Sequence, residues 1–120
     1  MIARREQRLR LWDMQDAAQK ILERTIDGRA AFMHDELVQV WVVHHLEIIG
    51  EAATHVSQGI RLSHPEVDWI AVTGTRNQLA HGYFDVDLGL IWETVERDVP
   101  VLLAQVARIL ESMSKVELAE

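Results

Sequence analysis

The chain has 120 residues and no cysteine, and it carries a net charge of -7 from 12 Lys and Arg against 19 Asp and Glu. This length suits a single domain over residues 1–120 with a real hydrophobic core. The lack of cysteine excludes disulfides and thiolate metal sites. No long apolar run is present, so we expect no membrane span and a cytoplasmic protein.

The charge of the whole chain counts against a non-specific nucleic-acid binder, which usually carries a basic face. The distribution of charge weakens this argument against nucleic-acid binding, because four arginines lie close together in the N-terminal segment: Arg4, Arg5, Arg8 and Arg10. Such a cluster is usually a solvated face. It could instead steer RNA or meet an acidic patch on a partner.

Apolar residues at three- and four-residue steps predict long amphipathic helices and no strand. The first helix is expected over residues 3–26 and ends at Asp27-Gly28, where Gly can adopt a left-handed conformation. The second is expected over residues 35–58, with a wide apolar face and Gly59 at its end. This wide face predicts a central position in the fold.

The third helix is expected over residues 65–81, because Pro65 suits a first helical turn and His64 or Ser63 sits near the cap. Gly74 inside this helix costs about 1 kcal/mol relative to Ala. A close helix crossing at Gly74 would explain its presence.

The fourth helix is expected to start at Asp85 or Asp87, and Pro100 should break its hydrogen-bond ladder and kink it. Short loops between long amphipathic helices favour antiparallel neighbours. We therefore predict an all-α, up-and-down four-helix bundle with room for a short extra helix.

Histidines and carboxylates at three- and four-residue steps form one stripe on the second helix: His44, Glu47, Glu51 and His55. Di-iron bundles use such spacing, but they need a matching pair on another helix, and the third helix offers none. We therefore expect no metal and no cofactor. Instead we expect Glu51 to cross the bundle and support Arg76 or His81, since Gly50 would let another helix approach.

Two other sets of residues have simpler interpretations. The remaining histidines of the helical region are expected at the surface or at helix caps: His34, His45 and His64. The tryptophans are expected mostly as core or dimer anchors: Trp12, Trp41, Trp69 and Trp92.

The segment 76–83 places Arg76, Asn77, His81 and Tyr83 at the expected end of the third helix. Arg binds phosphate with a fork of donors, and His exchanges a proton near neutral pH. Asn77 and His81 share a helical face, whereas Arg76 lies ~140° from His81 on an ideal helix. Either the last turn relaxes at Gly82, or a two-fold dimer pools two Arg and two His in one cleft.

These residues alone leave plainer interpretations open. An Arg and a His near a helix end are commonly surface residues that bond the last carbonyls. The Tyr83 ring could simply pack on the bundle. The order and spacing of further motifs favour a functional interpretation of these residues.

Arg76-Asn77 followed by His81-Gly82-Tyr83 resembles the Arg-x4-His-x-Tyr signature of HEPN-domain ribonucleases. In particular it resembles the HepT toxins of HepT/MntA toxin–antitoxin pairs. The likeness extends over about residues 35–110 and includes further segments at 49–53, 65–69, 82–87, 91–92 and 98–100.

This resemblance implies a homodimeric, metal-independent endoribonuclease toxin that leaves a 2′,3′-cyclic phosphate. Arg76 would bind phosphate, His81 would be the general acid and base, and Asn77 would orient. Tyr83 would accept AMP from an MntA-like nucleotidyltransferase antitoxin, which silences the toxin. The alternatives are a non-catalytic HEPN subunit that binds a nucleotidyltransferase with its nucleotide or substrate, and a plain helical dimerisation module.

Overall fold

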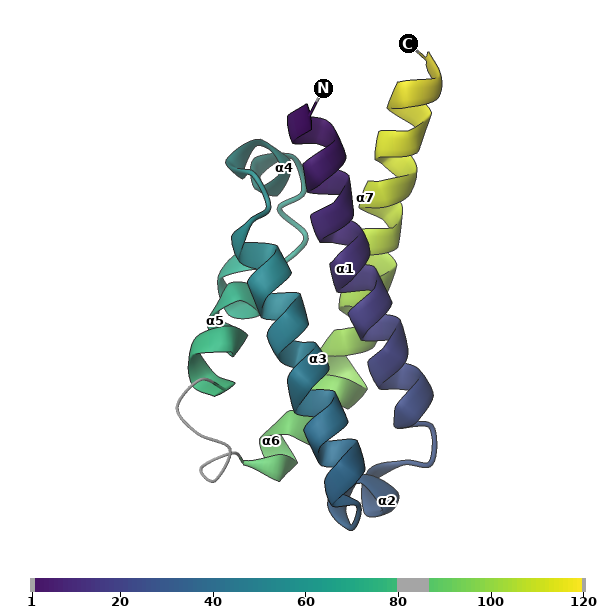
Figure 1. The fold of residues 1–120 in the computed structure, drawn as a ribbon, viewed down its shortest axis with the longest axis vertical. Helices are drawn as coiled ribbons and strands as arrows, with labels where there is room; N and C mark the ends of the chain where they lie inside the picture. The colour runs from purple at the N-terminus through teal and green to yellow at the C-terminus, as the bar shows by residue number, and fades with distance from the viewer. Residues whose placement is uncertain (1, 80–86, 120) are drawn as a thin grey trace.

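The computed structural model describes residues 2–79 and 87–119, and the side chains of residues 4–75 and 87–115. The described residues form helices and no strand. The long helices are α1 (Ile2–Arg24), α3 (Glu36–Thr54), α5 (Trp69–Leu79) and α7 (Val99–Ala119). They run alternately in opposite directions (Figure 1), so the predicted all-α, HEPN-like bundle is confirmed.

Shorter helices join the long ones: α2 (Arg29–Met33), α4 (Gln58–Ser63) and α6 (Leu88–Glu93). Helix α1 packs against α3 and α7, and α3 packs in turn against α5. The second predicted helix is therefore central (Figure 1). Within the described ranges, none of the helices has the length and apolar character needed to cross a membrane.

The core contains two of the four tryptophans. Trp69 and Trp92 are buried, as predicted, but Trp12 is 53% exposed and does not belong to the core. Trp41 is half-buried, and its indole Nε1 donates to the Lys20 carbonyl at 3.4 Å. The apolar spacing of α1 therefore predicts its inner face correctly and does not account for its one tryptophan.

The first helix ends in a turn that needs glycine. Helix α1 stops at Arg24, and Thr25 caps its last turn by donating its hydroxyl to the Ile21 carbonyl at 2.7 Å. Gly28 has a φ of +91°, which L side chains rarely adopt. The predicted positive φ at Gly28 is confirmed, but α1 ends before residue 26 and Gly28 is the N-cap of α2 rather than the terminator of α1.

The second predicted helix was too long. Helix α3 ends at Thr54 rather than at residue 58, and Gly59 lies inside α4 instead of closing α3. The cause is a contact from α1: Gln7 accepts a hydrogen bond from the Ser57 amide at 2.6 Å and donates to the His55 carbonyl at 2.9 Å. A side chain some fifty positions away thus takes over backbone groups that a longer helix would have used.

The third helix also starts later than predicted. It begins at Trp69, because Asp68 caps it by accepting from the Ala71 amide at 3.1 Å. Pro65 lies in the preceding turn, not in the helix. The Trp69 indole donates to the His64 carbonyl at 3.0 Å and ties this turn to the core.

The expected close crossing at Gly74 is not observed. A Cβ atom built at this position would meet nothing within 4 Å in the described part of the chain. Packing against the described residues therefore gives no reason for glycine at position 74.

The fourth predicted helix is α6 and α7 joined through a π-helical turn, η2 (Thr94–Asp98). Asp87 caps α6 by accepting from the Leu90 amide at 3.1 Å, as predicted, whereas Asp85 lies outside the described residues. The Val99 amide donates to the Thr94 carbonyl, five residues back. This wider turn comes directly before Pro100, which has no amide hydrogen to continue the ladder, so the predicted interruption is confirmed.

Candidate functional site

The Arg-Asn pair of the motif lies in the last turn of α5, which the structure describes to Leu79. The side chains of Arg76 and Asn77 lie outside the described residues, as do all of His81, Gly82 and Tyr83. Their predicted roles therefore stay predictions. What the structure does describe is the support on which this turn rests.

Buried side chains at the start of α5 fix its position. Val67 and Trp69 are 3% and 7% exposed, and Val72 packs against the same core. Thr73 adds a hydroxyl bond to the Trp69 carbonyl at 2.9 Å. Because α5 is anchored at this end and packs against α3, these contacts set the direction in which α5 runs to its last turn.

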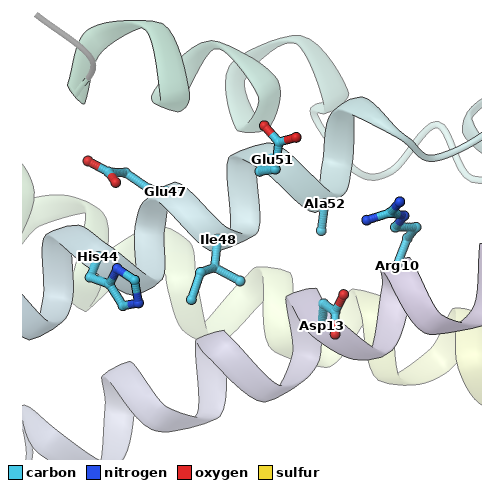
Figure 2. Close-up of a pocket in the computed structure, with 7 residues that line it drawn as sticks. All are labelled: Arg10, Asp13, His44, Glu47, Ile48, Glu51 and Ala52. Carbon is cyan, nitrogen blue, oxygen red and sulfur yellow. The ribbon is translucent and has the colours of Figure 1, made fainter.

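The predicted stripe on α3 is confirmed as one largely solvated face. His44, Glu47 and His55 are exposed, and Glu51 is half-buried. A groove of about 380 Å³ runs along this face, between α3 and α1. Figure 2 shows the carboxylates of Glu47 and Glu51 on the side of α3 towards α5, with Arg10 and Asp13 facing α3 from α1.

Glu51 has a partner within its own helix. Its Oε1 lies 3.1 Å from Nε2 of His55, the C-cap residue one turn further along, and both side chains are about half exposed. The predicted approach of Glu51 to Arg76 or His81 involves side chains outside the described residues and stays a prediction. In the described part of the chain, no three His, Asp or Glu side chains are placed to share a metal ion.

The groove carries more negative than positive charge. Asp13, Glu47 and Glu51 line it, together with the single cation Arg10 among the groove residues. Arg10 Nη2 lies 3.7 Å from Glu6 Oε1, so part of its charge is already balanced. Carboxylates repel phosphate and accept hydrogen bonds from guanidinium or imidazolium groups. The groove therefore suits support of a cationic side chain rather than direct binding of a nucleic-acid backbone.

No pattern in the sequence singles out Asp13. Its own neighbourhood is ordinary for a polar position on an amphipathic helix, and it lines the groove with Glu51 only because α1 packs on α3. Arg10 was recognised as one of four clustered arginines, but its place in the groove depends on the same packing. Only the tertiary arrangement brings these residues together.

One histidine was placed wrongly. His34 and His64 lie at helix C-caps, as predicted, but His45 is 6% exposed. Its Nδ1 donates to the Trp41 carbonyl at 2.7 Å, and its ring lies against the Trp41 ring with centroids 4.3 Å apart. The sequence did contain evidence that His45 could be buried. It shares a helical face with apolar Val42 and lies next to Leu46, and the Trp41 carbonyl one turn earlier can accept its hydrogen bond.

This chain is similar to a protein family and to several individual proteins. The ribonuclease HepT-like family matches residues 14–109. The chain is 33% identical over 106 residues to "Putative RNase MJ1380" of Methanocaldococcus jannaschii, covering 88% of this chain and 97% of that protein. It is also 39% identical over 71 residues to "Probable ribonuclease HepT" of Thermococcus cleftensis, covering 59% and 64% of the two chains.

A third relative is "Putative RNase TTE0752" of Caldanaerobacter subterraneus subsp. tengcongensis, which is 39% identical over 80 residues, 67% of this chain and 71% of that protein. No solved structure matches the chain. The family match spans most of the helical bundle and includes the end of α5 and the stripe on α3. The chain therefore belongs to the ribonuclease HepT-like family.

Proposed function

We propose that this protein is a metal-independent endoribonuclease that acts as the toxin of a toxin–antitoxin pair. One observation carries the proposal. The family match over residues 14–109 includes Arg76, Asn77, His81 and Tyr83 in the order of the ribonuclease motif. The Arg-Asn pair ends a helix that packs against α3, which carries Glu51.

In the proposed reaction, a base removes the proton of the 2′-hydroxyl and an acid protonates the leaving 5′-oxygen. His81 supplies both roles, one from each subunit of a homodimer. Arg76 binds the phosphate and stabilises the charge that develops on it. Asn77 orients these groups, and Glu51 supports a cationic side chain from α3.

The regulation that we propose acts at Tyr83. An MntA-like nucleotidyltransferase antitoxin transfers AMP to its phenol oxygen, and pyrophosphate leaves. The bulky, anionic AMP blocks the cleft and competes for Arg76. The family resemblance at residues 81–87 supports this step.

A second candidate is a non-catalytic subunit that binds a nucleotidyltransferase and its nucleotide or substrate. The acidic lining of the α1–α3 groove and the net charge of -7 favour it, because both disfavour a long RNA contact. In this case Arg76 and His81 contact a phosphate without breaking a bond.

Incubation of the purified chain with RNA in EDTA separates the two candidates. The ribonuclease proposal predicts cleavage and fragments that end in a 2′,3′-cyclic phosphate. Intact RNA, with the protein folded by circular dichroism, would favour the non-catalytic subunit. Mass spectrometry of the chain co-expressed with a neighbouring nucleotidyltransferase then tests for added AMP at Tyr83.

A further inference from the structure

Helix α1 holds an exposed tryptophan close to the N-terminal arginines. Trp12 is 53% exposed and Leu9 is 57% exposed. Arg5, Leu9 and Trp12 follow at four- and three-residue steps and therefore share one face, which we call the α1 stripe. A tryptophan normally stabilises a fold by burying a large apolar area. Packing within the described part of the chain does not account for a tryptophan at this position.

The structure divides the N-terminal arginines between two faces of α1. Arg10 lines the α1–α3 groove, and its Nη2 lies 3.7 Å from Glu6 Oε1. Arg5, by contrast, is exposed and makes no ion pair with any of the described residues. Residues 4–12 contain four Arg and one Glu, a local charge of +3 in a chain whose total is -7. The α1 stripe therefore presents positive charge beside an exposed indole.

The α1 stripe is short. Asp16 continues the same face, but its Oδ2 lies 2.9 Å from Nζ of Lys20, so these two charges balance each other. From Arg5 to Trp12 the helix rises ~10 Å, which matches two or three stacked nucleotides at ~3.4 Å each. A contact of this length is compatible with a chain that is acidic as a whole.

An arginine without an ion pair and an exposed aromatic ring on one face suit single-stranded nucleic acid. The guanidinium pairs with a phosphate, and the indole stacks on a base of any sequence. We infer that the α1 stripe binds two or three unpaired nucleotides of an RNA strand. Trp12 stacks on a base, Arg5 binds a phosphate, and Leu9 packs beside the sugar.

This inference rests on the proposed function for the choice of RNA as the ligand, and it adds a contact outside the motif at residues 76–83. Helix α3 lies between α1 and α5, which carries the Arg-Asn pair (Figures 1 and 2). The α1 stripe therefore adds to the affinity for RNA and does not touch the reacting phosphate. Its loss should raise KM and leave kcat unchanged.

Fluorescence anisotropy with a labelled, short 2′-O-methyl oligouridine tests the contact. This probe lacks the free 2′-hydroxyl that the proposed cleavage needs, so it stays intact. Trp12→Ala should raise the Kd at least about tenfold through the loss of one base stack, whereas Trp12→Phe should keep most of the affinity. Arg5→Gln should reduce the slope of log Kd against log salt concentration by about 0.7, the value for one phosphate of a single strand.

Two variants away from the α1 stripe serve as matched controls. Leu37→Ala changes an 83% exposed leucine at the start of α3, and Arg97→Gln changes an exposed arginine in η2. Both should bind the probe with the affinity and the salt dependence of the wild type. Circular dichroism of each variant checks that the helical fold is kept.

Several outcomes would overturn the inference. These are a wild type that does not bind the probe, and a Kd that neither Trp12→Ala nor Arg5→Gln changes. Another is a Trp12→Ala variant that sediments as a different assembly but binds the probe like the wild type, because the α1 stripe would then serve a protein contact. Binding through the α1 stripe without RNA cleavage would count against the ribonuclease proposal alone. Cleavage by Trp12→Ala with the KM of the wild type would count against this inference alone.

Discussion

The two faces of helix α3 differ in burial and in chemistry. Its inner face carries Val42, Leu46, Ile49 and Ala53, each no more than 4% exposed. Its outer face carries the His44 to His55 stripe, largely in solvent. Burial of apolar surface by the inner face stabilises the bundle, whereas the solvated outer face can hold carboxylates and imidazoles at little cost. Substitutions on the two faces should therefore separate stability from activity.

The largest expected effect on stability is on the inner face. Leu46→Ala should lower the free energy of unfolding by about 3 kcal/mol, because it removes buried methyl groups and leaves a cavity. Leu37→Ala, on the 83% exposed leucine of the same helix, should change it by less than about 0.5 kcal/mol. Urea denaturation followed by circular dichroism measures both. Equal losses would contradict the division between the faces.

The outer face should show the reverse. Glu51→Gln should lower the rate of RNA cleavage about tenfold, the effect of losing ~1.4 kcal/mol of support to a cationic group. The exposed pair with His55 is worth less than about 0.5 kcal/mol, so the free energy of unfolding should hardly change. Glu47→Gln, one turn earlier on the same stripe, is the matched control. Equal rates for Glu51→Gln and the wild type would remove Glu51 from the site.

The N-cap of α3 stabilises the whole helix and therefore contributes to both faces. Asp35 accepts hydrogen bonds from the amides of Leu37 and Val38 at 3.1 and 3.2 Å. Asp35→Ala should cost about 1 kcal/mol of stability, whereas Asp35→Asn should keep most of it. The two variants are compared by thermal unfolding. Equal destabilisation by Asn and Ala would show that the carboxylate acts through charge rather than as a cap.

The smallest effect is expected on α5 and has the opposite sign. Gly74→Ala should stabilise the protein by about 0.5–1 kcal/mol, because Ala is the better helix former and the described residues leave space for its methyl group. Thermal unfolding at low and high protein concentration measures it. A loss of stability that grows with concentration would show that another chain occupies the space beside Gly74.

The sequence predicted the parts of the fold that depend on local periodicity. The long helices and their inner faces follow from three- and four-residue apolar spacing, and Gly28 and Asp87 mark ends whose chemistry is local. Helix ends set by distant side chains were missed. The end of α3 depends on Gln7 of α1. The start of α5 was missed for a local reason, because Asp68 rather than Ser63 or His64 caps it.

The candidate site likewise has a part that local sequence predicts and a part that depends on packing between helices. The stripe on α3 was predicted because one helix suffices to define it. The groove was not, because Arg10 and Asp13 reach it only through the packing of α1 on α3. His45 was misplaced because a polar side chain was assumed to need solvent, whereas a single backbone acceptor one turn away satisfies its Nδ1.

The most direct test of the proposed function is the rate of RNA cleavage in EDTA by His81→Ala, with His34→Ala as a control on an exposed histidine. Loss of a general acid and base predicts a fall of about 10²–10⁴-fold for His81→Ala. The control should cleave at the wild-type rate, and both variants should unfold like the wild type. Undiminished cleavage by pure His81→Ala protein would contradict the account.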